Sequence, residues 1–220
     1  MTRTTEYLRN GSLRLALHTL AGGEGRPLLL LHGLGEESPQ ERPEWTAAWN
    51  GPVLALDFTG HGMSEVPVSG GYTPEGLMSD VDAVLAERGP VTIVGRGFGA
   101  WVGLLVAGAR TALVHGVVLF DGSGLAGGGS QPPTPYVNVL PASGSVTPDP
   151  YALLELSRDP RPPDYALDYV RFILEDSELD DPIIVSSRIR PEWLAAVAAD
   201  IGVIELPLEQ AIERFASSNS

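Results

Sequence analysis

Residues 91–101 read VTIVGRGFGAW, and the order of residue types in this stretch decides the fold. The apolar, β-branched run at 91–94 predicts a buried strand, and the apolar run that begins at Phe98 predicts a helix. The glycines between them match the frame G-x-S-x-G of a nucleophile elbow, a tight strand-to-helix turn that pushes its central side chain out above a sheet. Gly97 holds the central position, so this turn carries no hydroxyl where a nucleophile would stand.

Further short apolar runs predict the rest of a sheet. Several of them stop at glycine-rich turns, which is typical of strands that are buried on both faces. We expect strands at residues 4–9, 13–20, 27–31, 53–58, 91–94, 117–120, 183–185 and 203–204, and helices at 44–49, 74–88, 98–110, 191–200 and 208–215. This alternation predicts the α/β class, with a mostly parallel, doubly wound sheet whose ligands bind at the carboxyl ends of the strands.

Residues 122–182 break this rhythm. Residues 126–150 are rich in Gly, Pro and Ser and predict an extended loop, while 150–157 and 163–179 predict two helices. We therefore expect a core made of residues 1–121 and 183–220, with residues 122–182 as a small helical lid or cap insertion.

Length and composition bound the functional classes. A chain of 220 residues with 43% hydrophobic and 19% charged residues predicts one globular domain with an ample core. The net charge of −14 argues against nucleic acid and anionic membrane surfaces as partners. The chain has neither lysine nor cysteine, which excludes a Schiff-base lysine, a P-loop lysine, thiol catalysis and disulfides.

The sequence lacks the motifs of a signal peptide, a membrane span, a metal site and a dinucleotide site. The first residues lack the apolar stretch of a signal peptide, and no apolar run has the length of a membrane span, so we expect a cytoplasmic protein. No His, Asp and Glu residues share metal-ligand spacing, and residues 95–100 lack the G-x-G-x-x-G spacing of a dinucleotide site. We expect no metal and no cofactor. The arginine-only, Ala/Gly/Pro-rich composition is typical of high-GC bacterial coding.

Three turns in the same order and spacing carry a resemblance to a known family. They read LHGLG at 31–35, DFTGHGMS at 57–64 and GRGFG at 95–99. With these turns the chain resembles the α/β-hydrolase superfamily, from residue 13 through the last expected helix. The resemblance implies the α/β-hydrolase fold and a chemistry in which a serine attacks a carbonyl, a histidine oriented by an acid moves the proton, and two backbone amides stabilise the oxyanion.

The chain departs from this pattern at all three side chains. The nucleophile position holds Gly97, no histidine follows His115, and Arg190 stands where the resemblance implies the acid. Asp121, one strand earlier, is an alternative acid. These departures imply an atypical member with a degenerate triad, a pseudoenzyme with respect to serine hydrolysis.

The oxyanion elements are present in the sequence. The resemblance implies amides from Leu34, which follows His32 and Gly33, and from Phe98. Phe98 also opens a helix, whose N-terminus adds partial positive charge. We therefore expect an oxyanion-hole-like pocket for a small molecule, with Gly33, Leu34 and Phe98 as binding residues.

Three functions remain open at this point. The first is a non-hydrolytic enzyme, such as a lyase, isomerase, epimerase or cyclase, that acts on a carbonyl-containing small molecule with Asp121 and His32 as catalytic residues. The second is a non-catalytic pseudo-hydrolase that binds a ligand or a protein partner. The third is an esterase with a displaced triad, which would pair Ser64 or Ser123 with His32 or His61. Both histidines have a structural alternative, as hydrogen-bonded residues of their own turns.

Overall fold

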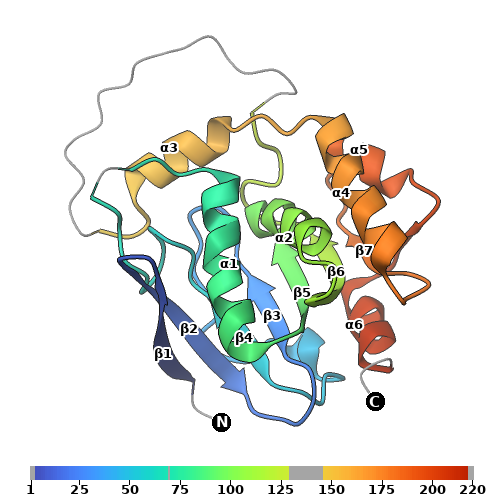
Figure 1. Cartoon of the computed structure of the whole chain (residues 1–220), viewed down its shortest axis with the longest axis horizontal. Coiled ribbons are helices and arrows are strands. Elements are labelled where there is room, and N and C mark those ends of the chain that lie inside the picture. The colour runs from blue at the N-terminus through green and yellow to red at the C-terminus, as the bar shows by residue number, and fades with distance from the viewer. Residues whose placement is uncertain (1–2, 69, 129–145, 218–220) are drawn as a thin grey trace.

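A sheet of eight strands forms the centre of the described chain, which comprises residues 3–68, 70–128 and 146–217 of this computed structural model (Figure 1). The strands are β1 (Thr4–Asn10), β2 (Leu13–Ala21), β3 (Leu28–Leu31), β4 (Val53–Leu56), β5 (Val91–Arg96), β6 (Val114–Phe120), β7 (Ile183–Ser186) and β8 (Val203–Glu205). Their order across the sheet is β1-β2-β4-β3-β5-β6-β7-β8. The pairs β1–β2 and β2–β4 are antiparallel and all others are parallel, which confirms the predicted mostly parallel sheet.

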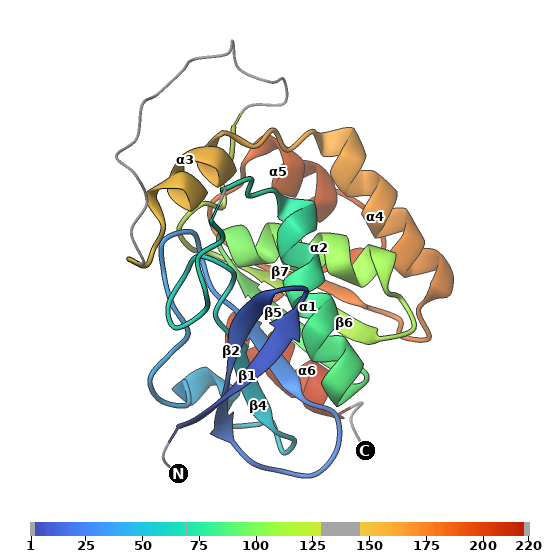
Figure 2. The same ribbon diagram turned by 60° about the vertical axis from the view of Figure 1, so that its left-hand side comes forward.

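Helices cover both faces of the sheet unequally. The helices are α1 (Pro74–Arg88), α2 (Phe98–Ala109), α3 (Pro150–Arg158), α4 (Pro163–Asp176), α5 (Glu192–Ala198) and α6 (Leu208–Ser217), with a short 3-10 helix η1 (Glu44–Thr46). One face packs against α1, α2, α4 and α5, whereas η1 and α6 pack on the other (Figures 1 and 2). The predicted helix at 44–49 is thus only a 3-10 turn, and β1 and β2 form a hairpin at the sheet edge (Figure 2).

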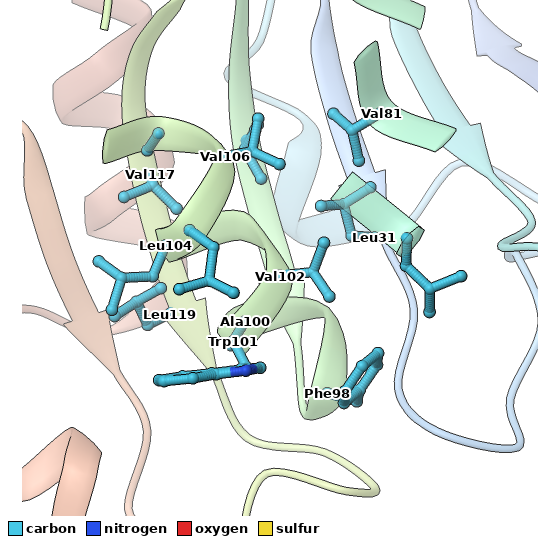
Figure 3. Close-up of a cluster of buried hydrophobic side chains, with 14 of the residues drawn as sticks. Leu31, Val81, Phe98, Ala100, Trp101, Val102, Leu104, Val106, Val117 and Leu119 are labelled. Atoms are coloured by element: carbon cyan, nitrogen blue, oxygen red, sulfur yellow. The ribbon is translucent and has the colours of Figure 1, made fainter. Parts of the chain in front are cut away.

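Alternation along the strands divides the core into two clusters. Leu29 and Leu31 of β3 join the larger cluster, while Leu28 and Leu30 join the cluster on the opposite face. Figure 3 shows the larger one, in which side chains of α2 lie over Leu31 and other strand residues. Almost every residue of α2 is buried, because this helix packs against β5 and β6 and also contacts α1 and α4. The turn that begins α2 is therefore held rigidly.

The two helices of the predicted insertion are present as α3 and α4. Tyr72 donates its hydroxyl to Asp149 at 2.7 Å, and Glu155 accepts the Tyr72 amide at 2.6 Å, so α3 lies against the residues that precede α1. Helix α4 packs on α2 and α5 and extends the helical layer. Of the predicted loop at 126–150, residues 129–145 lie outside the described residues.

None of the helices in the described ranges is long and apolar enough to cross a membrane.

Candidate functional site

The turn between β5 and α2 has the geometry of the predicted elbow. Gly97 has φ +58° and ψ −118°, a backbone conformation that glycine adopts without the penalty that other residues carry. Its amide donates to the Phe120 carbonyl at 2.9 Å, and its carbonyl accepts from the Ala100 amide at 3.0 Å. The turn is thereby fixed to β6 on one side and to the first turn of α2 on the other.

The space above Gly97 is filled by residues 122–125, which follow β6 and which we call the plug. A Cβ atom placed on Gly97 would lie 2.2 Å from the Ser123 carbonyl oxygen and 2.5 Å from the Gly122 carbonyl carbon. Real Cβ atoms do not approach backbone this closely, so any side chain at position 97 would have to move the plug. Glycine is thus required here by contact as well as by conformation.

The two amides expected to form the oxyanion hole both donate a hydrogen bond to one oxygen. The Leu34 amide donates to the Ser123 carbonyl at 3.0 Å, and the Phe98 amide donates to the same carbonyl at 2.9 Å. Two convergent backbone donors at these distances are the geometry that stabilises an oxyanion in acyl transfer. Here the oxygen that they bind belongs to the chain itself.

Glu36 holds the plug from the side of β3. Its carboxylate accepts the Ser123 hydroxyl at 2.9 Å, the Arg96 Nε at 2.8 Å and the Gly33 amide at 3.2 Å. Burial raises the pKa of Glu36, but the hydrogen bonds from Arg96 and Ser123 outweigh burial and hold that pKa below its usual value. Glu36 therefore remains a carboxylate at neutral pH and keeps the Ser123 side chain in place.

Arg161, which lies between α3 and α4, holds the plug from the side of these two helices. It is 2% exposed, and its Nη1 donates to the carbonyls of Leu125, at 2.7 Å, and Gly124. The guanidinium carbon lies 5.1 Å from the centre of the Phe98 ring, a cation–π distance. Burial lowers the pKa of Arg161 to about 10, so the side chain still carries its charge at neutral pH. The Trp193 indole also donates to the plug, to the Leu125 carbonyl at 3.0 Å.

The carboxylate of Asp121 is hydrogen-bonded to the turn that follows β7. It accepts the Ser187 hydroxyl, the Arg188 amide at 2.8 Å and the Ile189 amide at 3.0 Å. Burial raises the pKa of Asp121, but these hydrogen bonds outweigh it, so the pKa lies below its usual value. Asp121 thus organises the turn that follows β7.

Both ring nitrogens of His32 are hydrogen-bonded to backbone groups. Its Nδ1 lies 2.7 Å from the Gly33 carbonyl oxygen, which can only accept, and its Nε2 accepts the Phe58 amide at 3.1 Å. The ring is 5% exposed, and burial lowers its pKa. His32 is consequently a neutral imidazole whose two nitrogens join β3 to the turn after β4.

His61 lies beside it, with ring centres 5.1 Å apart. Its Nδ1 donates to the Thr59 carbonyl at 3.2 Å, and its Nε2 is buried without a hydrogen-bond partner among the described residues. Burial lowers the pKa of His61 to about 4. This ring, too, is neutral at physiological pH.

The serines of the displaced-triad hypothesis are hydrogen-bonded to other groups. The Ser64 hydroxyl donates to the Asp57 carbonyl at 2.5 Å and accepts the Ala16 amide at 2.8 Å. The Ser123 hydroxyl donates to Glu36. Within the described ranges no serine hydroxyl is hydrogen-bonded to a histidine, and no group of three or more His, Asp and Glu residues could hold a metal ion.

Sequence reasoning missed the residues that close the site. Glu36 follows the oxyanion turn and Arg161 stands in a proline-rich stretch, and both read as ordinary surface charges. The position of the Ser123 carbonyl depends on the path of a loop, for which the sequence has no periodic signal.

Comparisons with known proteins agree with this fold. The sequence model of a family described as the alpha/beta hydrolase family matches residues 28–217. The 2-hydroxymuconate semialdehyde hydrolase of Pseudomonas putida is 33% identical over 110 residues, which cover 47% of this chain and only 38% of that protein. Among solved structures, the thioesterase domain from the curacin biosynthetic pathway has a TM-score of 0.62 at 17% identity and covers 99% of both chains. The epoxide hydrolase VrEH1 from Vigna radiata has a TM-score of 0.45 at 23% identity over 54% of this chain and 40% of its own.

Proposed function

The chain belongs to the alpha/beta hydrolase family, and from that premise we propose that it is a non-catalytic member whose role is to bind a ligand or a protein partner. One observation carries the proposal: the Ser123 carbonyl accepts both amides that would otherwise stabilise a substrate oxygen. The proposal also accounts for Gly97, which offers no nucleophile, and for the absence of histidine after position 115.

A non-hydrolytic enzyme on carbonyl compounds fits the same site less well. A substrate oxygen could reach the amides of Leu34 and Phe98 only after the plug had left, which would break its bonds to Arg161, Trp193 and Glu36 as well. The candidate proton carriers, Asp121 and His32, already have their polar atoms hydrogen-bonded within the protein. This geometry favours binding over turnover.

The displaced esterase triad has less support still. A serine nucleophile needs a base within hydrogen-bond distance of its hydroxyl. The Ser64 hydroxyl is bonded to a carbonyl, which is not a base. The Ser123 hydroxyl is bonded to the Glu36 carboxylate, whose pKa is held below its usual value and which is therefore a weak base.

Turnover assays on the purified chain test the proposal. We expect no hydrolysis of p-nitrophenyl acetate or butyrate above the buffer rate, no labelling by a fluorophosphonate probe, and no deuterium exchange next to the carbonyl of simple ketones and 2-oxo acids. The matched variants are Ser64→Ala, Ser123→Ala, His32→Gln and Asp121→Asn, which remove the four candidate groups one at a time. Turnover by the wild type that falls in any of these variants would show an enzyme and overturn the proposal.

A further inference from the structure

A cavity of about 640 Å³ opens at the carboxyl ends of β6, β7 and β8, and we call it the carboxyl-edge cavity. Its volume falls within the range of small-molecule sites, and open α/β sheets bind their ligands at this edge. Only two residues, Leu206 and Pro207, connect β8 to α6, so this connection is too short to cover the cavity. The walls that matter for binding are formed by Trp45, Phe120, Arg188, Arg190, Leu206 and Leu208.

One nitrogen of the Arg190 guanidinium has no hydrogen-bond partner among the described residues. Its Nη2 donates to Glu205 at 2.6 Å, but its Nη1 is buried and has no hydrogen-bond partner in the described part of the chain. A buried donor on a charged group that lacks a partner is destabilising, because the bonds it made to water are not replaced. Because Nη1 is buried, an acceptor in the cavity reaches it only when the guanidinium turns toward the cavity, and such a bond would supply the missing partner.

Arg188 adds a second guanidinium. Its amide is fixed by the Asp121 carboxylate, while its exposed side chain forms no ion pair with any described residue. The cavity also contains three carboxylates, but that of Asp121 accepts three hydrogen bonds and that of Glu205 is paired with Arg190. Glu209 is the remaining one, and it is exposed on the first turn of α6. The lining thus holds two arginines and three carboxylates, and the arginine donors without partners are the groups that an anionic ligand would bind.

Apolar surface continues beyond these charges. Trp45 and Phe120 line the carboxyl-edge cavity and also a neighbouring cavity of about 280 Å³. Leu30, Leu31 and Val94 contribute to the walls of the neighbouring cavity. A ligand that spans both spaces would bury an apolar body next to the two aromatic rings.

We propose that the carboxyl-edge cavity binds a small molecule with one carboxylate and an apolar body. The ligand carboxylate binds the guanidinium groups of Arg190 and Arg188, and the apolar body of the ligand packs against Trp45 and Phe120. This inference rests on the proposed binding role and names the class of ligand for it.

The test uses 4-phenylbutyrate as the probe, with its neutral amide, 4-phenylbutanamide, as the matched ligand. Binding is measured by calorimetry and by the NMR signal of the Trp45 indole. Trp45 is the one half-buried tryptophan, since the other three are at most 1% exposed, and Trp45→Phe assigns its signal. We expect the carboxylate to shift the Trp45 signal saturably and to bind about tenfold or more tightly than the amide, as a charge-assisted hydrogen bond predicts.

Charge-matched double variants complete the test. Arg188→Gln with Arg190→Gln should weaken the carboxylate about tenfold or more and leave the amide unchanged. Arg171→Gln with Arg214→Gln removes two exposed arginines that are paired elsewhere, with Asp168 and Asp181, and should change neither. Equal affinity for acid and amide, equal effects of the two double variants, or no binding of the carboxylate would each overturn the inference. Turnover in the enzyme assays would instead overturn the proposed function and leave a positive binding result standing.

Discussion

At Gly97 the backbone, and not a side chain, determines what the site can do. The positive φ of this residue shapes the elbow, and the absence of a Cβ lets the Ser123 carbonyl approach the amides of Leu34 and Phe98. The sequence predicted the elbow and its missing hydroxyl. It could not predict the occupant, because a glycine-rich loop such as residues 122–125 has no pattern that fixes where a carbonyl points.

Replacing Gly97 with serine should not create an esterase. The substitution adds backbone strain and a clash with the plug, so we expect the free energy of unfolding to fall by about 2 kcal/mol or more. Urea unfolding and p-nitrophenyl butyrate hydrolysis measure the two effects.

Gly11→Ser is the control for a serine at positive φ without a clash. Gly11 has φ +59°, almost the value of Gly97, but a Cβ there would have no neighbour within 4 Å. Its variant should show only the strain, about 1 kcal/mol. Equal destabilisation by the two substitutions, or a burst of nitrophenol from Gly97→Ser, would contradict the closed site.

His61 should make the fold sensitive to acid. Its folded-state pKa of about 4 lies below the usual value of 6.5, so the unfolded chain binds the proton more tightly. Stability is therefore complete above pH 6.5 and falls as the pH drops through the folded pKa, by about 3 kcal/mol from this residue. The difference between the unfolding curves of wild type and His61→Asn across this pH range isolates the contribution. A His61 ring that NMR shows to be protonated near pH 6.5 would refute the assignment.

At the scale of elements, the buried guanidinium of Arg161 joins the plug to the segment between α3 and α4. Arg161 donates to two plug carbonyls and lies over the ring of Phe98, the first residue of α2. Strands, helices and their order followed from apolar runs and glycine turns, because those patterns directly reflect burial. The link made by Arg161 did not, since a single arginine in a loop has no period and its partners are backbone atoms.

Arg161→Met should loosen the plug. The change removes the Arg161 bonds to the Gly124 and Leu125 carbonyls, and Leu125 keeps its bond from the Trp193 indole. The loss at Gly124 costs about 1–3 kcal/mol, although removal of a buried charge offsets part of that cost. We expect the amides of Leu34 and Phe98 to exchange hydrogen about tenfold faster or more.

Arg171→Met provides the comparison for Arg161→Met. Arg171 lies on α4, is 63% exposed and pairs only with Asp168 three residues earlier, so this variant should leave both exchange rates unchanged. If Arg161→Met left the two amides as protected as in the wild type, Arg161 would not hold the plug.

At the scale of the whole molecule, the closed elbow and the carboxyl-edge cavity lie at the same end of the sheet. The elbow after β5 is covered by the chain itself, while the ends of β6, β7 and β8 enclose an open cavity. From the sequence we expected a small-molecule pocket at the elbow, beside Gly33, Leu34 and Phe98, and the sequence showed only that Gly97 lacks a hydroxyl and that Arg190 stands in place of an acid. It could not indicate which space would remain open, because that depends on how loops distant in sequence fill the edge.

The most direct test of the closed site is an NMR measurement of scalar couplings across hydrogen bonds in the deuterated, isotope-labelled chain. We predict that the Ser123 carbonyl carbon couples to both the Leu34 and the Phe98 amide nitrogens, because their donor–acceptor distances are 3.0 and 2.9 Å. Both amides should also exchange slowly with solvent. Absence of both couplings, with rapid exchange at Leu34 and Phe98, would mean that the amides are free to bind a substrate oxygen and would contradict the non-catalytic function.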